Sequence, residues 1–312
     1  MFDHAALAGA IAAHGPVARV VIAAHDGSCP REVGAAMLVW ADPAKDGGQS
    51  GTIGGGALEW EATKAARAML ATGGMRLDRQ ALGPALGQCC GGAVTVLTEV
   101  YSGLPPDTDV IARSIDGREM PLAVKRLLAR VRGEGIIPAT QLLQGWFVEP
   151  AARPNRHLWI WGAGHVGRAL VDVLSPLPGL AITWVDIAPD RFPDGVPDRV
   201  RALPVATPEA AVGFAPKDAE HLILTYSHAL DLALCHHLLT HGFARAGLIG
   251  SATKWARFRS RLKALGHQPA AIAGITCPIG DPSLGKHPQA IAIGVATQFL
   301  HPPKAARQES TG

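Results

Sequence analysis

The second half of the chain alternates short apolar runs with longer segments in which polar residues recur at helical spacing. Four runs rich in apolar, β-branched or aromatic residues predict strands at residues 157–161, 181–185, 221–225 and 246–249. The longer segments predict helices at 164–174, 231–241, 252–265 and 289–300. Strands that alternate with helices in this way predict a doubly wound parallel sheet with helices on both faces.

The first half of the chain is less regular but also mixes both kinds of element. It predicts strands at residues 18–24, 35–40 and 94–100, and helices at 58–71 and 122–131. A proline-rich polar stretch at 149–156 indicates a domain boundary. We therefore expect an α/β protein with a small N-terminal α/β domain at 1–150, a parallel-sheet domain at 157–301 and a flexible tail at 302–312.

Composition narrows the class of protein. With 48% hydrophobic and 18% charged residues, the chain of 312 residues is too apolar to be intrinsically disordered. No apolar run approaches the roughly 18 residues that span a bilayer, and the net charge of +3 comes without a dense Lys/Arg tract. We expect neither a membrane nor a nucleic-acid partner. The absence of a secretory pattern at the N-terminus and the odd number of cysteines, five, favour reduced thiols and a cytoplasmic location.

A glycine motif follows the first predicted strand of the second half. Residues 162–167 match G-x-G-x-x-G, open a predicted helix, and precede a second strand that ends at Asp186. In a Rossmann-like fold such glycines allow a tight turn, close approach of a phosphate and close helix packing, and the helix N-terminus attracts anions. The candidate ligand-binding residues are Gly162, Gly164, Gly167 and Asp186. The alternative is a retained fold whose crevice no longer binds a nucleotide.

His165 stands inside this motif, where dinucleotide-binding sites usually have a small or apolar residue. Its imidazole at the first turn of the helix can donate a hydrogen bond to an anionic ligand. Alternatively, the ring packs against the neighbouring loop.

A second glycine-rich loop precedes the helix predicted at 58–71. Successive backbone amides in such a loop can form an anion-binding concavity, which makes Gly54, Gly55 and Gly56 candidate ligands. The loop is not a Walker A motif, because it lacks the Gly-Lys-Ser/Thr sequence. The alternative is a tight turn that needs positive φ angles. Glu59 follows the loop, where capping is the commoner role and contact with ligand amino groups the other.

Two adjacent cysteines, Cys89 and Cys90, stand among glycines. A thiolate there can bind a soft metal such as molybdenum or carry sulfur, so both are candidate metal ligands. The alternative is two small buried side chains. Cys29 lies near Arg31, which favours its thiolate, and Cys277 lies in a loop before Pro278. Cys235 is expected in a helix core.

Other catalytic patterns are missing from the sequence. Three histidines, His236, His237 and His241, fall on a predicted helix, and exposed helix histidines are the favoured interpretation over a zinc site. There is no nucleophile elbow, no set of kinase motifs and no arrangement of nucleophile, base and orienting acid.

Taken together, these motifs make the sequence resemble the XdhC/CoxF family, accessory proteins of xanthine dehydrogenase and related molybdenum hydroxylases. The resemblance covers nearly the whole chain. It is carried by residues 27–34, 51–59, 88–92, 161–167, 250–255 and 277–285.

The resemblance implies a carrier rather than an enzyme. Family members look like proteins that bind the molybdenum cofactor, shield it, let a cysteine desulfurase exchange an oxo ligand for sulfido, and deliver it to the dehydrogenase. The implied partners are the molybdenum-binding subunit of xanthine dehydrogenase, the desulfurase and proteins of cofactor biosynthesis. The cofactor is cargo, with both glycine loops near its phosphate and Cys89 or Cys90 nearest the metal. A homodimer is the default assembly.

Two alternatives remain open at this point. An NAD(P)-dependent oxidoreductase would use the G-x-G-x-x-G site and Asp186. A pure interaction protein would use the Rossmann-like domain as a scaffold for docking a dehydrogenase subunit.

Overall fold

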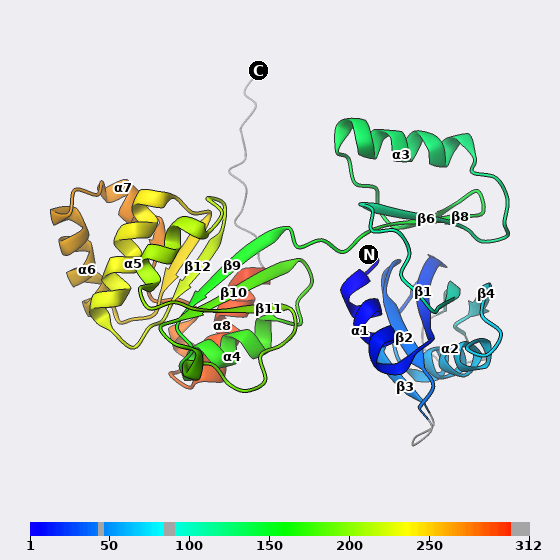
Figure 1. The fold of residues 1–312 in the computed structure, drawn as a ribbon, viewed down its shortest axis with the longest axis horizontal. Helices are drawn as coiled ribbons and strands as arrows, with labels where there is room; N and C mark the ends of the chain where they lie inside the picture. The colour runs from blue at the N-terminus through cyan, green and yellow to red at the C-terminus, as the bar shows by residue number, and fades with distance from the viewer. Residues whose placement is uncertain (43–46, 84–90, 301–312) are drawn as a thin grey trace. The chain divides into compact units, whose positions relative to one another are not determined.

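The computed structural model describes residues 1–42, 47–83 and 91–300, which form two compact units (Figure 1). The first unit covers Met1–Arg153 and the second begins at Pro154, so the chain divides inside the proline-rich stretch. The candidate ligands Cys89 and Cys90 and the polar tail lie outside the described residues.

A five-stranded antiparallel sheet organises the N-terminal unit, in the order β3-β2-β1-β5-β4. The central strand β1 is buried on both faces over its first seven residues. Val20 and Ile22 pack with Leu58 of helix α2, whereas Val21 and Ala23 on the opposite face pack with Phe147 of a second sheet. The strands are β1 (Val17–Asp26), β2 (Ala36–Trp40), β3 (Gly48–Gly51), β4 (Met75–Ala81) and β5 (Ala93–Tyr101), and the helices are α1 (His4–His14) and α2 (Gly56–Met69).

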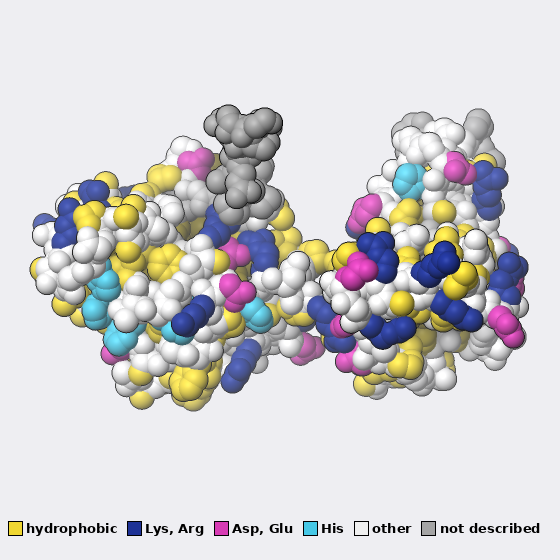
Figure 2. Space-filling view, turned by 90° about the horizontal axis from the view of Figure 1, so that it is seen from above, with side chains coloured by type: hydrophobic (Ala, Val, Ile, Leu, Met, Phe, Trp, Pro, Cys, Tyr) yellow, Lys and Arg dark blue, Asp and Glu magenta, His cyan; other side chains and the backbone are white. Residues whose placement is uncertain are grey.

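The second sheet of this unit has the order β6-β8-β7 and carries helix α3. Its elements are β6 (Val110–Ser114), α3 (Leu122–Glu134), β7 (Gln141–Leu143) and β8 (Trp146–Pro150). Leu127, Leu128 and Val131 of α3 pack toward the sheet, as the periodicity predicts. Lys125 and Arg126 are exposed, and Lys and Arg side chains gather on the face that carries α3 (Figure 2).

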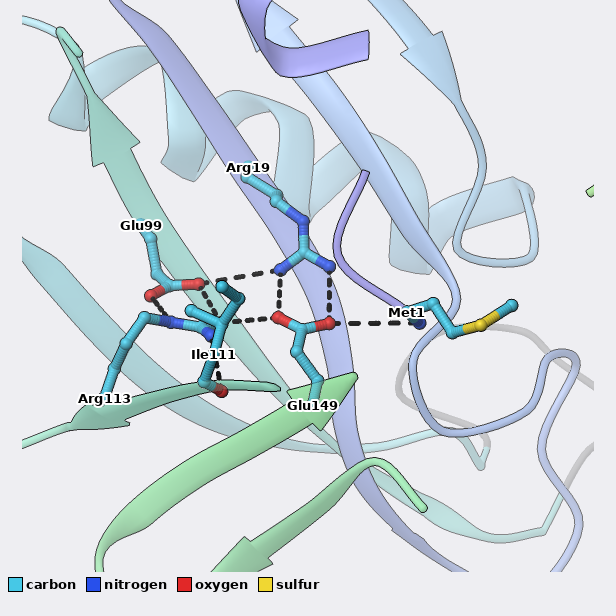
Figure 3. A network of polar contacts seen from close by, with 6 residues as sticks. All are labelled: Met1, Arg19, Glu99, Ile111, Arg113 and Glu149. Carbon is cyan, nitrogen blue, oxygen red and sulfur yellow. Dashed lines mark hydrogen bonds and ion pairs between the residues drawn. The ribbon is translucent and has the colours of Figure 1, made fainter. Parts of the chain in front are cut away.

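Four charged side chains lie between the two sheets, and all but Arg113, which is half-buried, are buried (Figure 3). Glu149 of β8 is fully buried, and its two oxygens accept hydrogen bonds from Arg19 Nη1 and Nη2 of β1, at 2.9 and 2.8 Å. Arg113 of β6 donates from Nη2 to Glu149 at 2.6 Å and to Glu99 of β5 at 2.8 Å. Two arginines therefore face two glutamates, and the pairs link the sheets.

The C-terminal unit is a six-stranded parallel sheet in the order β11-β10-β9-β12-β13-β14. Counted along the chain, this is 3-2-1-4-5-6, the strand order of the Rossmann fold. The predicted fold class is confirmed. The strands are β9 (Arg156–Trp161), β10 (Leu180–Asp186), β11 (Val200–Pro204), β12 (Glu220–Ile223), β13 (Arg245–Leu248) and β14 (Ile275–Thr276).

Helices cover both faces of this sheet (Figure 1). One apolar core packs α4 and α8 against the strands, and the other packs α5 and α6. The helices are α4 (His165–Leu174), α5 (His228–His241), α6 (Ala252–Ala264), α7 (Pro269–Ile272) and α8 (Pro288–Leu300), with 3-10 helices η2 (Pro189–Arg191), η3 (Pro208–Phe214) and η4 (Pro282–Leu284). Helix α5 begins three residues before the predicted start, because Ser227 caps it by accepting from the amide of Leu230. Within the described ranges, no helix has the length and apolar character needed to cross a bilayer.

Candidate functional site

The G-x-G-x-x-G loop joins β9 to α4 at the carboxyl end of the sheet, beside the point where the strand order reverses. Gly162 has φ +120°, and a Cβ there would lie 2.5 Å from the carbonyl oxygen of Leu224. A Cβ on Gly167 would lie 2.0 Å from the carbonyl oxygen of Gly162. Both glycines are thus required by the packing of the loop and helix, whether or not a ligand binds.

Gly164 differs from these two glycines. It is the N-cap of α4 and provides no side-chain cap, and an added Cβ would meet no atom within 4 Å. The first amides of a helix lack intrahelical partners, so the end of α4 is open to an anion. His165, the first residue of α4, is exposed, which does not fit the interpretation that its ring packs against the neighbouring loop.

Asp186 lies at the end of β10 and is almost fully buried. Its Oδ2 accepts from the amide of Ala163 at 2.6 Å and its Oδ1 from the amide of Ile187 at 2.7 Å. Arg191 Nε lies 3.5 Å from Oδ1. The carboxylate that would hold ribose hydroxyls in a dinucleotide site is therefore occupied with fixing the glycine loop.

A partly buried ion pair lies at the same edge of the sheet and could not be identified from the motifs. Asp231 of α5 is fully buried and accepts from Lys254 Nζ of α6 at 2.6 Å and from Thr225 Oγ1 at 2.7 Å. Lys254 also donates to the carbonyl oxygen of Ile249 at 2.8 Å. Because Thr225 and Ile249 follow β12 and β13, the pair joins the carboxyl ends of neighbouring strands. The only sequence indication was the family resemblance of residues 250–255.

The cysteines of the described residues do not form a metal site. Cys277 is half-buried, with Sγ 3.8 Å from the carbonyl oxygen of Gly250, and burial raises the pKa of its thiol although the Lys254 charge opposes this. Burial also raises the pKa of Cys235 to about 12, and its predicted place in the core is confirmed. Cys29 packs at the edge of the core beneath β1.

The helix histidines are not the exposed side chains that the sequence favoured. His236 Nδ1 lies 2.7 Å from His267 Nε2, and His241 Nε2 lies 2.8 Å from the carbonyl oxygen of Ala215. Only His237 of the three is exposed. Over residues 1–42, 47–83 and 91–300, no group of three or more His, Cys, Asp or Glu side chains could hold a metal ion.

The glycine loop of the N-terminal unit already holds an anion of the protein itself. Glu59 Oε2 accepts from the amides of Ile53 and Gly55 at 2.9 and 3.0 Å and from the hydroxyl of Thr52. The amide of Gly54 donates to Thr52 Oγ1 at 3.1 Å. Burial raises the pKa of Glu59, but these hydrogen bonds outweigh it and lower the pKa below its ordinary value. The amides of Gly54 and Gly55 therefore already have partners in the protein, Thr52 of the loop and Glu59 of α2.

The three glycines of this loop all have positive φ angles, 127°, 74° and 62° for Gly54, Gly55 and Gly56. The alternative interpretation, a tight turn that needs such angles, is thus confirmed. An external anion would have to displace Glu59 or use other groups nearby. A pocket of about 660 Å³ opens beside the loop, along α2.

Comparison with known proteins matches both units of the chain. A family model described as the XdhC Rossmann domain matches residues 158–299, and a model described as the XdhC and CoxI family matches residues 10–80. No curated protein matches the sequence.

Among solved structures, the chain is similar to a crystal structure from Bacillus halodurans titled a xanthine dehydrogenase. The TM-score is 0.66 at 21% identity, over 96% of this chain and 95% of that one, which shows a shared fold. A wide-type short-chain dehydrogenase/reductase from Veillonella parvula, in complex with NADP, matches at 16% identity over 45% of this chain and 63% of its own. Its TM-score of 0.28 is too low to show a shared fold. With both family models matching along one chain, the protein belongs to the XdhC and CoxI family.

Proposed function

We propose that this protein is a maturation factor for a molybdenum hydroxylase of the xanthine dehydrogenase type. It binds the molybdenum cofactor as cargo, shields it, supports its sulfuration by a cysteine desulfurase and delivers it to the molybdenum-binding subunit. The observation that carries this proposal is the match of both units to XdhC family models. Proteins of cofactor biosynthesis are the proposed source of the cargo, and a homodimer in the cytoplasm is the proposed assembly.

The geometry of the C-terminal unit supports a binding role at the open end of α4. The cofactor carries a phosphate, and the uncapped first turn after Gly164 offers amides and a helix dipole to such a group. His165 is exposed beside them and can donate a further hydrogen bond. Gly162, Gly167 and Asp186 keep the loop in shape. Cys89 or Cys90 remains the proposed neighbour of the metal.

The test is cofactor retention by the purified protein. Wild-type protein made in cells that synthesise the cofactor is expected to retain molybdenum and pterin after gel filtration, measured by metal analysis and pterin fluorescence. Gly164→Ala adds a methyl group at the N-cap of α4 without a clash and is expected to reduce retention. Gly133→Ala on α3, which also meets no atom within 4 Å, is the matched control. Wild-type protein that retains no cofactor would remove the proposal.

Gly162→Val would fail for steric reasons alone, so Gly164 is the informative position. Cys89→Ala and Cys90→Ala test the thiol role separately; normal retention by both would exclude it.

The alternative of an NAD(P)-dependent oxidoreductase rests on the glycine motif. Against it, Asp186 is almost fully buried and both of its oxygens accept backbone amides. Titration with NADH separates the two: saturable binding with turnover favours the oxidoreductase, and its absence favours the carrier.

A further inference from the structure

A cavity lies at the amino end of the parallel sheet, opposite the edge that carries the G-x-G-x-x-G loop. The first residues of β12 and β13 and helix α8 contribute to its lining, and its volume is about 110 Å³. An apolar cavity of about 150 Å³ can hold benzene, so this one fits a ligand of about five non-hydrogen atoms. One wall is apolar and consists of Leu222, Ile279, Val295 and Phe299.

The polar wall contains two charged groups that do not reach each other. Glu220 begins β12 and Arg245 begins β13, and the two are partners in the register of the sheet. Glu220 is only 6% exposed, and its Oε2 and Arg245 Nη1 are buried atoms with no hydrogen-bond partner among the described residues. They lie 3.7 Å apart, beyond the roughly 2.7–3.2 Å of an N–H···O hydrogen bond. Because buried polar atoms are normally satisfied, a ligand with both a donor and an acceptor would complete this wall.

The charges around Glu220 favour an anion. Arg156 begins β9, and its Nε donates to Glu220 Oε1 at 2.6 Å while its Nη1 donates to the carbonyl oxygen of Phe299 at 3.2 Å. The guanidinium carbons of Arg156 and Arg245 lie 4.8 and 5.6 Å from the centre of the Phe299 ring. These contacts hold both arginines in place before any ligand arrives. Two guanidinium groups against one carboxylate leave one positive charge, which a monoanion would balance.

We infer that this cavity binds a small 2-hydroxycarboxylate. Its carboxylate accepts from Arg245 Nη1, its hydroxyl donates to Glu220 Oε2, and its carbon atoms lie against the apolar wall. A carboxylate without the hydroxyl would leave Glu220 Oε2 unsatisfied. An amino acid also offers a donor and an acceptor, but as a zwitterion it would leave the positive charge unbalanced. The cavity and the open end of α4 lie at opposite ends of the strands, so the inference does not depend on the proposed function.

NMR titration of the full chain tests the site, with glycolate as the probe and acetate and glycine for comparison. A ligand of about five non-hydrogen atoms is not expected to bind more tightly than micromolar, so the titration extends to millimolar concentrations at constant ionic strength. Glycolate is expected to bind saturably and to shift the amide signals of Glu220, Arg245 and Phe299 but not that of Gly164. Acetate lacks the hydroxyl and is expected to bind about tenfold more weakly, because a hydrogen bond to a charged group contributes about that factor.

Substitutions at the two charged residues test the contacts one at a time. Arg245→Met keeps the aliphatic stem and is expected to weaken glycolate binding about tenfold or more. In Glu220→Gln, Arg156 would hold the amide oxygen and turn the NH₂ group toward the cavity, so glycolate should lose its advantage over acetate. Arg201→Met on the exposed edge strand β11 is the matched control and should bind glycolate as the wild type does. The amide spectrum of each variant reports whether it is folded.

Three results would overturn the inference. The first is wild-type protein that does not bind glycolate, or binds it no better than acetate. The second is equal affinity for glycolate in folded Arg245→Met and in the wild type. The third is tighter binding of glycine than of glycolate, since the site would then recognise an ammonium group rather than a net negative charge.

Discussion

Replacing Glu149 with alanine is expected to destabilise the N-terminal unit strongly. Glu149 is fully buried and accepts three hydrogen bonds from two guanidinium groups. Its removal leaves Arg19 and Arg113 with Glu99 as the remaining carboxylate of the cluster. Breaking a buried pair and leaving a charge uncompensated costs about 3–5 kcal/mol, against a total domain stability of about 5–15 kcal/mol. Glu149→Ala is thus expected to remove a large fraction of the free energy of unfolding.

The measurement must distinguish the two units, because multidomain proteins do not unfold in one step. Unfolding in urea can be monitored by hydrogen exchange with mass spectrometry, which measures the stability of peptides before and after Arg153 separately. Asp107→Ala is the matched control, since it breaks an exposed ion pair with Arg153 and is expected to change nothing measurable. Only peptides of the first unit should respond to Glu149→Ala.

A paired substitution separates charge balance from simple loss of contacts. Arg19→Met with Glu149→Leu leaves Arg113 facing Glu99, so the remaining buried charges balance, and the Met1 ammonium that also faces Glu149 is half-exposed to water. Replacing a buried ion pair by apolar side chains is often neutral, so the double variant is expected to recover most of the loss. If Glu149→Ala unfolds at the same urea concentration as the control, or the double variant is no more stable than the single one, the reasoning is refuted.

The same cluster has a defined pH dependence. Burial raises the pKa of Glu149, but the charges of Arg19 and Arg113 outweigh it and hold the pKa below its ordinary value of 4.5. A carboxylate with a lowered folded-state pKa contributes stability above about pH 4.5, which is lost as the pH falls through the folded-state pKa. Glu149→Ala should therefore reduce the acid sensitivity of the first unit.

Three further predictions concern single side chains. Gly167→Ala should lower the thermal midpoint of the second unit because its Cβ would lie 2.0 Å from a carbonyl oxygen, whereas Gly164→Ala should not; equal midpoints in calorimetry would contradict this. Burial and the charge of His241 lower the pKa of His221 to about 3, so stability should fall below about pH 6.5 by up to about 1.4 kcal/mol per pH unit. His221→Gln should flatten that fall in unfolding experiments, and an unchanged slope would show that another group titrates. Glu59→Ala leaves loop donors without their acceptor and should cost about 1–3 kcal/mol, with faster hydrogen exchange at residues 49–59; unchanged exchange would exclude the capping role.

Much of the C-terminal fold could be predicted because its strands are buried on both faces. Residues 158–161 are all buried, and such strands appear in the sequence as continuous apolar runs. The edge strands β11 and β14 were missed because they lack such apolar runs. β11 carries Arg201 and Pro204, and β14 has only two residues, so neither gives a run long enough to recognise.

The second sheet of the N-terminal unit was missed because its strands contain charged residues. Arg113 and Glu149 resemble surface residues when read from sequence, and only their pairing shows that they are internal. Their strand positions are 36 residues apart, and Arg19 is 130 residues from Glu149, so no local pattern links them. Helix α1 was also missed, although Asp3 caps it by accepting from the amide of Ala6 at 2.9 Å.

In the candidate site, too, the contacts between residues close in sequence could be predicted and those between distant segments could not. The roles of Gly162 and Gly167 in shaping the loop follow from backbone sterics, which sequence spacing conveys well. The contacts of Glu59 are also local, four to ten residues away, and capping was the favoured interpretation. The pair of Asp231 and Lys254 depends on the side-by-side placement of two strand ends, which only the tertiary structure provides.

The two-by-two balance of the cluster between the sheets has an evolutionary consequence. A lineage that loses Arg19 alone would inherit an unbalanced interior, and so would one that loses Glu149 alone. Substitutions at these positions should therefore become fixed together, and homologous chains should keep both residues or replace both with apolar ones.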